Sequence, residues 1–239
     1  MHDHIKTIIL AGGLGTRLKG ALGALPKPMA PIGDGPFLVY LTRFFSKQGF
    51  DDIIISCGHG ADTIKTYFED GSRLGLRIEY TFETELLGTG GALKLAEPLV
   101  DSEDFIVANG DTYFDVDLNE MYCFHKERGA VATIALAHKE DTGRYGSVVS
   151  DSHNRIVSFS EKKPEGQAGH INGGVYIFRK EVFARIPDGK VISLEREILP
   201  ALIEKGLYGF PANGYFIDIG IPEDYERAKK ELPGMSKVL

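Results

Sequence analysis

The chain has 239 residues, a hydrophobic content of 43% and a formal net charge of −7 at pH 7. This length and apolar content suit one large α/β domain, or two small ones, with a real hydrophobic core. The acidic balance argues against a general nucleic-acid binder, so an anionic ligand would have to be held by local cations.

Short apolar runs alternate with helical patterns in the first half of the chain. We expect strands at residues 5–10, 53–55, 77–81 and 105–107 and helices at 36–48, 62–68 and 89–96. This alternation predicts parallel crossovers and a doubly wound sheet. Ligands of such sheets lie outside the carboxyl ends of the strands, so the loops after residues 10, 81 and 108 should converge there.

The second half has shorter strands that are separated by turn residues. We expect strands at residues 131–137, 147–150, 155–159, 175–178 and 215–219 and helices at 194–203 and 222–232. No repeat, low-complexity run or clear linker divides the sequence. We therefore expect one α/β domain over residues 1–239, with a mixed, mostly parallel sheet flanked by helices and smaller antiparallel strands in the second half.

The cysteines and the absence of targeting patterns bear on the compartment. Cys57 and Cys123 are far apart in apolar surroundings, which is typical of buried free thiols in a reducing compartment. The seven histidines show no metal-ligand spacing. We see no secretory or membrane-spanning run, so we expect a cytoplasmic protein without a membrane partner.

The strongest chemical signal lies in residues 8–32, which read I-I-L-A-G-G-L-G-T-R-L-K-G-A-L-G-A-L-P-K-P-M-A-P-I. An apolar run breaks into a glycine-rich loop, whose N–H groups would favour a phosphate. Arg17 adds a forked cation suited to phosphate oxygens. Lys27 adds a point charge, and the prolines on both sides limit backbone freedom around it.

Two common phosphate-binding patterns fit this stretch poorly. The Walker pattern has no match in the chain. The dinucleotide fingerprint matches at Gly13 and Gly15 but has Leu18 in its third place, and Asp34 lies in a Gly-Asp-Gly turn instead of at a strand end. An NAD-dependent enzyme, which would bind a dinucleotide without Mg²⁺, is therefore disfavoured.

Two aspartates that lie far apart in the sequence indicate a metal site. Asp111 follows the fourth expected strand in an N-G-D turn, and Asp218 lies in the apolar run F-I-D-I-G. Mg²⁺ is commonly held by one or two carboxylates and substrate phosphates, and a cation would compensate a charge in apolar surroundings. The alternative for Asp111 is an ordinary turn, but the pair predicts a Mg²⁺ site.

The glycine loop, Arg17 and then Lys27 between its two prolines resemble, in this order, the G-G-x-G-T-R-L and P-K-P signature of the sugar-1-phosphate nucleotidyltransferases. Residues 19–25 depart from the P-L-T that many members have there. The resemblance extends through L-G-T-G-G-A, N-G-D, R-Y-G, I-N-G-G and D-I-G, over Ile8 to Tyr225. It implies a Rossmann-like fold with a nucleotide-binding half at about 1–115 and a sugar-phosphate-binding half at about 116–239.

The family resemblance also implies roles for individual residues. The nucleotide would contact Leu10, Ala11, Gly12, Gly13, Gly15, Thr16, Arg17, Lys27, Glu83, Gly88 and Thr89. The sugar phosphate would contact Tyr145, Gly146, Glu161, Lys162, Asn172 and Gly173. Arg17, Lys27, Asp111, Asp218 and Lys162 would be catalytic, with Mg²⁺ on the two aspartates.

Several of these segments have plain structural alternatives. Thr89 would also suit a helix cap, and the charged residues 161–163 an exposed turn in which either lysine points inward. The segments around Gly146 and Gly173 would also suit a bulge or a hairpin turn.

The implied reaction is attack of a sugar 1-phosphate oxygen on the α-phosphorus of a nucleoside triphosphate, with release of pyrophosphate. A phosphomonoester has a second pKa of about 6, so the nucleophile needs no general base.

A carboxylate at Glu83 matches the paired donors of guanine, which favours GTP. The overall pattern is most similar to the subgroup that transfers a guanylyl group to a heptose 1-phosphate; transfer to mannose 1-phosphate and cytidylyl or uridylyl transfer to glucose 1-phosphate are the alternatives. A non-catalytic nucleotide-sugar sensor on the same fold is the alternative of another class, and either could form a homo-oligomer.

Overall fold

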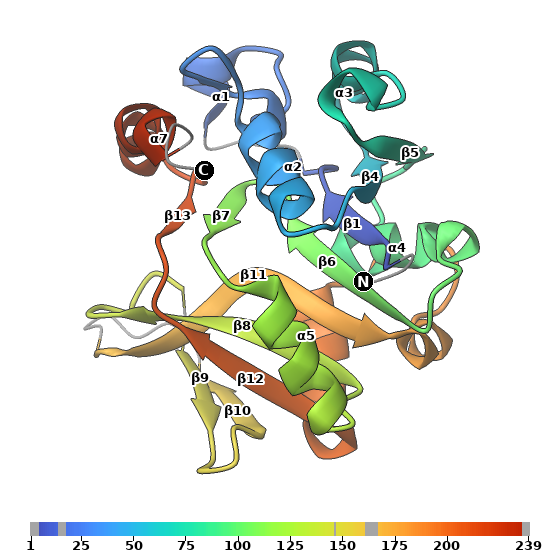
Figure 1. Ribbon diagram of the computed structural model, residues 1–239, viewed down its shortest axis with the longest axis vertical. Coiled ribbons are helices and arrows are strands. Elements are labelled where there is room, and N and C mark those ends of the chain that lie inside the picture. The colour runs from blue at the N-terminus through green and yellow to red at the C-terminus, as the bar shows by residue number, and fades with distance from the viewer. Residues whose placement is uncertain (1–4, 14–17, 146, 161–166, 236–239) are drawn as a thin grey trace.

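A seven-stranded sheet runs through the centre of the structure (Figure 1). The computed structural model describes residues 5–13, 18–145, 147–160 and 167–235. The strands of the sheet are β1 Thr7–Leu10, β4 Asp52–Cys57, β5 Arg77–Phe82, β6 Asp104–Asn109, β8 Ala132–Lys139, β11 Gly169–Arg179 and β12 Leu207–Ala212. They follow the order β12-β8-β11-β6-β1-β4-β5 across the sheet.

Most neighbouring strands in this sheet run parallel. The four strands β6, β1, β4 and β5 run parallel to one another, and β12 is parallel to β8. β11 is antiparallel to both β6 and β8. The expected mixed, mostly parallel sheet is therefore confirmed.

Helices cover both faces of the sheet, so the central strands are buried on both sides. Ile8 and Ile54 belong to one apolar cluster, whereas their neighbours Ile9 and Ile55 belong to the other. The helices that pack into the cluster of Ile9 are α1 Lys19–Leu22, α2 Phe37–Lys47, α3 Ala61–Phe68, α5 Leu118–Glu127 and α7 Pro222–Met235. Those that pack into the cluster of Ile8 are α4 Gly88–Leu95 and α6 Leu199–Ala201. Burial on both faces explains why the parallel strands are continuous apolar runs.

Short helical turns and three small antiparallel pairs complete the described fold. The turns are η2 Lys27–Met29, η3 Ser72–Leu74, η4 Glu97–Leu99, η5 Lys180–Arg185, η6 Leu194–Ile198 and η7 Ile203–Lys205. The pairs are β2 Pro31–Ile32 with β3 Gly35–Pro36, β7 Thr112–Phe114 with β13 Phe216–Asp218, and β9 Ser147–Ser150 with β10 Ile156–Ser160. β9, β10 and β13 match short strands expected in the second half, whereas β7 was not expected.

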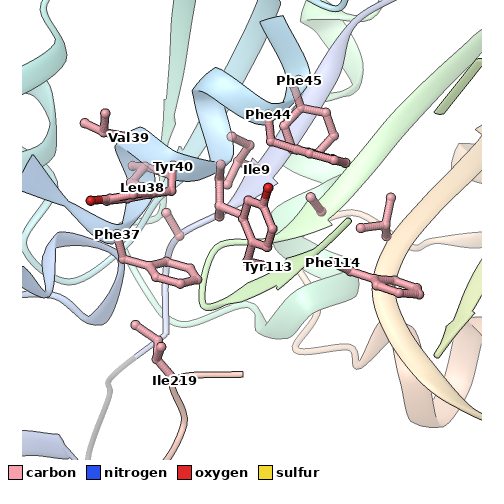
Figure 2. Packing of buried hydrophobic residues seen from close by; sticks show 14 of the residues in the cluster. Ile9, Phe37, Leu38, Val39, Tyr40, Phe44, Phe45, Tyr113, Phe114 and Ile219 are labelled. Atoms are coloured by element: carbon pink, nitrogen blue, oxygen red, sulfur yellow. The ribbon is translucent and has the colours of Figure 1, made fainter. Parts of the chain in front are cut away.

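The β7–β13 ribbon is anchored to the core by aromatic side chains. Tyr113 is buried and meets the ring of Phe44 on α2 edge to face, with 5.4 Å between ring centroids (Figure 2). Phe114, on the opposite side of the strand, meets Phe216 of the partner strand at 5.7 Å. Edge-to-face pairs of this kind favour one arrangement over others. The core therefore fixes the ribbon, and the residues at its end, against α2.

Several elements differ from the sequence predictions, and three of them matter most for the second half. Helix α5 was not expected, although Asp117 caps it by accepting from the N–H groups of Asn119 and Glu120, both at 2.9 Å. Edge strand β12 was also not expected. The helix expected at 194–203 is broken into η6, a π-helical turn, followed by α6 and η7. Pro200 has no N–H to continue a regular ladder, which accounts for the break.

The two cysteines are free, but only one fits the expectation. Cys57 is buried, and burial raises the pKa of its thiol to about 12. Cys123 is exposed, so its prediction as a buried thiol was wrong: α5, which was not expected, presents it to solvent. Within the described ranges, no helix has both the length and the apolar character needed to cross a bilayer.

Candidate active site

Three loops meet at the carboxyl edge of the parallel strands, as the alternating pattern predicted. They follow β1, β5 and β6 and enclose a cavity of about 470 Å³. The cavity is lined by Leu10, Ala11, Gly12, Gly13, Lys27, Pro28, Glu83, Leu86, Gly88, Thr89, Ala92, Asn109, Gly110, Asp111 and Val191. Every described residue that the sequence assigned to the nucleotide therefore lines one cavity.

Lys27 and Asp111 form an ion pair at this cavity. Lys27 Nζ lies 2.7 Å from Asp111 Oδ2, and their side chains are 12% and 31% exposed. Lys27 begins the turn η2, which Pro26 and Pro28 favour, so the ammonium projects from a stiff segment. Gly110 brings the Asp111 loop against β1, because a Cβ there would lie 2.7 Å from the Leu10 carbonyl oxygen.

Asp218 lies beside this pair because of the ribbon register. It is paired with Thr112 across the β7–β13 ribbon, and the Ile219 N–H donates to the Asp111 carbonyl at 3.0 Å. Burial, and then the charge of Asp111, raise the pKa of the Asp218 carboxyl to about 6. The Gly220 N–H, Lys27 and then Arg144 act in the opposite direction.

The two carboxylates and Lys27 thus form one electrostatic unit, and an additional cation would relieve the repulsion between the carboxylates. Within the described residues, no group of three or more His, Cys, Asp or Glu is placed to hold a metal ion. A cation at this pair would need further ligands, and the phosphates of a substrate are suited to that role.

Glu83 has a fixed orientation in the cavity. Its Oε2 accepts from the Leu87 N–H at 2.9 Å. Its Oε1 lies so close to Gly12 that a Cβ at that position would overlap it. Burial raises the pKa of the Glu83 carboxyl, against the effect of the Leu87 N–H. The carboxylate therefore faces the first glycine loop with little freedom to turn away.

Thr89 does not cap the helix that follows, so the alternative role suggested by the sequence was wrong. Helix α4 begins at Gly88, after Leu87 as N-cap, and has no side-chain cap. Thr89 lies within the first turn, and its hydroxyl instead donates to Glu195 Oε2 at 2.7 Å.

A second cavity, of about 880 Å³, adjoins the first and shares Asn109 with it. It is lined by Asn109, Thr112, Tyr145, Ser147, Val148, Phe159, Asn172, Gly174, Glu195, Arg196, Pro200, Phe216 and Asp218. Two of the described sugar-phosphate residues, Tyr145 and Asn172, are therefore on its wall. Asp218 belongs to this wall and Asp111 to the first cavity, so the carboxylate pair lies where the two cavities meet.

Asn172 and the glycines that follow it in the I-N-G-G segment also have structural roles. Asn172 Oδ1 accepts from the Gly174 N–H at 2.9 Å, and Asn172 Nδ2 donates to the Tyr176 hydroxyl at 2.9 Å. Gly173 is buried, and a Cβ there would lie 2.5 Å from the Phe114 ring. The structure places Gly174, not Gly173, on the cavity wall. The segment forms an irregularity inside β11 instead of preceding a strand.

Sequence reasoning missed Glu195 and Arg196, which it placed only within an expected helix. Both line the second cavity, and Arg196 is exposed. Among the described residues, no carboxylate forms an ion pair with the Arg196 guanidinium. The charged run Glu195-Arg196-Glu197 ahead of Pro200 was the available signal.

Six assigned residues lie outside the described ranges: Gly15, Thr16, Arg17, Gly146, Glu161 and Lys162.

The structure is that of an α/β protein with a cavity at the carboxyl edge of its parallel strands and a second cavity beside it, which is where such sheets bind their ligands. A family model described as nucleotidyl transferase matches residues 6–234, and the chain belongs to this family.

Similar proteins span nearly the whole chain. A D-glycero-alpha-D-manno-heptose 1-phosphate guanylyltransferase from Aneurinibacillus thermoaerophilus is 44% identical over 230 residues, which are 95% of this chain and 98% of that protein. A protein of the same description from Campylobacter jejuni is 40% identical over 92% of this chain and 97% of its own length. The crystal structure of HddC from Yersinia pseudotuberculosis has a TM-score of 0.84 and 37% identity, covering 95% of this chain and 99% of that one; a second structure of it, complexed with GMP-PN, matches equally well.

Proposed function

We propose that the protein transfers a guanylyl group from GTP to D-glycero-α-D-manno-heptose 1-phosphate, giving GDP-heptose and pyrophosphate. The observation that carries the proposal is the Lys27, Asp111 and Asp218 unit at the junction of two cavities. The choice of substrates is supported by the two heptose 1-phosphate guanylyltransferases that the chain resembles and by the GMP-PN complex of HddC.

The first cavity would hold GTP. Its glycine-lined wall presents backbone, and Lys27 supplies a cation for the phosphates, with Arg17 assigned to the same role. Glu83 would accept from the N1 and N2 donors of guanine, since its carboxylate already faces this cavity. On binding, the Lys27 ammonium would exchange its Asp111 partner for phosphate oxygens.

The second cavity would hold the sugar 1-phosphate. Tyr145 and Asn172 would contact the sugar, together with Glu161, and Lys162 would contact its phosphate. The guanidinium of Arg196, which forms no ion pair with a described carboxylate, suits the same phosphate. Holding this anion beside the α-phosphate of GTP is the main task, because the attacking oxygen is already ionised.

In the reaction, a phosphate oxygen of the sugar 1-phosphate forms a bond to the α-phosphorus. The bond from that phosphorus to the oxygen bridging to the β-phosphate breaks, and pyrophosphate leaves with the electron pair. Lys27 would stabilise the charge on the transferred group. No side chain has to remove a proton.

Asp111 and Asp218 would hold Mg²⁺ in company with the substrate phosphates. The residues fit such an ion: the two carboxylates repel each other, and the pKa of Asp218 is raised to about 6. When bound, the ion would neutralise phosphate charge and align the two reactants.

The decisive experiment is a substrate panel with purified protein and Mg²⁺. Pyrophosphate release should have its highest kcat/KM with GTP and D-glycero-α-D-manno-heptose 1-phosphate, and Lys27→Ala serves as the inactive control. A higher kcat/KM with mannose 1-phosphate, or with glucose 1-phosphate and CTP or UTP, would replace the proposed substrates. If the protein binds substrates but releases no pyrophosphate with any combination of nucleotide and sugar phosphate, it is a non-catalytic nucleotide-sugar sensor instead of an enzyme.

A further inference from the structure

The segment from Lys190 to Glu195 bridges the two cavities. Val191 lines the first cavity and is 74% exposed, whereas Glu195, four residues later, lines the second. The segment is joined to the start of α4 by backbone hydrogen bonds. The Gly90 N–H donates to the Ile192 carbonyl at 2.8 Å, and the Ile192 N–H donates to the Leu87 carbonyl at 2.8 Å.

The glycines of the L-G-T-G-G motif make this contact possible. A Cβ at Gly88 would lie 2.6 Å from the Ile192 carbonyl oxygen, and one at Gly91 would lie 2.6 Å from the Lys190 carbonyl oxygen. Such distances are not tolerated against backbone atoms, so side chains here would push the segment away. These glycines are therefore accounted for by packing of the chain against itself, whether or not a nucleotide is present.

Thr89 completes the contact with its side chain. Its hydroxyl donates to Glu195 Oε2 at 2.7 Å and accepts from the Leu194 N–H at 2.8 Å. The hydroxyl proton is thereby used, so it is not available to a nucleotide phosphate. Glu195 Oε2 also accepts from the Ser193 hydroxyl at 3.1 Å. Together these bonds fix the first turn of η6.

The turn η6 carries the next residue, Arg196, on the wall of the second cavity. Its π-helical form is rare, and such turns are frequent at functional sites. Ser193 caps it by accepting from the Arg196 N–H at 3.2 Å. The backbone position of Arg196 thus depends on a turn that is hydrogen-bonded to Thr89, on the wall of the other cavity.

We infer that Thr89 is a positioning residue that couples the two cavities: through Glu195 it sets the place of Arg196 in the second cavity, and nucleotide binding at the L-G-T-G-G loop is thereby transmitted to the sugar-phosphate site. The inference deepens the proposed function and rests on it for the identity of the ligands. It assigns Thr89 to the sugar-phosphate site, although Thr89 lies on the wall of the nucleotide cavity.

The test compares Thr89→Val, which keeps the shape of the side chain and removes the hydroxyl, with Thr89→Ser, which keeps the hydroxyl. For Thr89→Val, we expect the KM for the sugar 1-phosphate to rise by about tenfold or more, since bonds to a carboxylate and to a helix-start N–H are lost. The Kd for GTP, measured by calorimetry without the sugar phosphate, should change by less than about twofold. Thr89→Ser should behave like the wild type.

A double-mutant cycle with Glu195→Ala then tests the route. Thr89→Val should raise the sugar 1-phosphate KM by much less when Glu195 is already absent, because the bond of its hydroxyl to that carboxylate is then already lost and only the bond to the Leu194 N–H remains. Additive effects would overturn the inference. A raised Kd for GTP with an unchanged sugar 1-phosphate KM would also overturn it, because Thr89 would then be a nucleotide contact.

Hydrogen–deuterium exchange of residues 190–198 provides a readout that needs no turnover. In the ligand-free protein, the Leu194 amide should exchange faster in Thr89→Val than in Thr89→Ser, because its acceptor is lost. GTP should increase protection of this segment in the wild type and in Thr89→Ser but not in Thr89→Val. Equal exchange in the two variants refutes the inference, whereas absence of pyrophosphate release by the wild type refutes only the proposed function.

Discussion

Asp218→Asn should make the metal-free protein more stable at neutral pH, although it removes a residue assigned to catalysis. The Asp218 carboxyl has its pKa raised to about 6, chiefly by burial and then by the charge of Asp111. Since the folded state holds this proton more tightly than the unfolded chain does, the contribution is favourable at low pH and is lost as the pH rises from about 4 through 6. Ionised Asp218 therefore costs folding free energy at pH 7.5.

The rise in pKa from 3.8 to about 6 corresponds to about 3 kcal/mol above pH 6. Asparagine has nearly the same shape and keeps an oxygen to accept from the Gly220 N–H, which lies 2.6 Å from Asp218 Oδ1. It carries no charge to repel Asp111. We expect a gain of about 1–3 kcal/mol at pH 7.5, where the upper value assumes that the amide costs nothing to bury.

Urea unfolding in EDTA, measured from pH 4 to 8, checks this expectation. The two proteins should have similar free energies of unfolding near pH 4, diverge as the pH rises from about 4 to 6, and keep a nearly constant difference at higher pH. Mg²⁺ should then narrow the gap at pH 7.5, because an ion at tenfold excess over its Kd adds about 1.4 kcal/mol to the wild type. An Asn variant that is less stable than the wild type at pH 7.5, or a constant difference at all pH values, would refute the reasoning.

Three further substitutions test the nucleotide cavity. Lys27→Ala should lower kcat by about 100-fold or more with little change in Tm, because the Asp111 it leaves is 31% exposed and accessible to water; activity near the wild-type level would contradict its role. Glu83→Gln should raise the KM for GTP by about tenfold and reduce discrimination against UTP, while the amide oxygen keeps the Leu87 N–H as partner; unchanged base preference in kcat/KM would remove Glu83 from base recognition. Gly12→Ala should raise the KM for GTP, because its methyl group would overlap Glu83 Oε1; the same substitution at Gly13, where a Cβ meets no atom within 4 Å, is the matched control, and equal effects of the two would count against the packing argument.

The parallel half of the fold was predictable because its signals are local. Strands such as Ile53-Ile54-Ile55 are continuous apolar runs, and each is followed by a helical pattern. Once parallel, such strands must end at the same edge of the sheet, so the meeting of the β1, β5 and β6 loops followed without any knowledge of tertiary contacts.

Features that depend on contacts between segments far apart in the chain were harder to predict from the sequence. Asp111 and Asp218 are brought together by the register of the β7–β13 ribbon, which joins segments about a hundred residues apart, and nothing local in either segment specifies this partner. The pairing followed only from the chemistry that two carboxylates imply. Helix α5 was missed although Asp117 ahead of Leu118 and Met121 is an ordinary start signal.

The glycines were assigned to a ligand because sequence alone does not say what approaches a missing side chain. At Gly173 it is the Phe114 ring, and at Gly88 it is the Ile192 carbonyl. Similarly, the position of Glu195 and Arg196 on the wall of the second cavity depends on the break at Pro200, where a π-helical turn replaces the regular helix that the sequence predicted.

The shared wall at Asn109 has a consequence for the product. A nucleotide sugar contains both recognition groups in one covalent molecule, so it would occupy both cavities without the second loss of translational freedom that two separate reactants incur. Product inhibition should consequently be strong, and a synthetic bisubstrate mimic, with a non-cleavable bridge in place of the reacting phosphates, should outcompete either reactant.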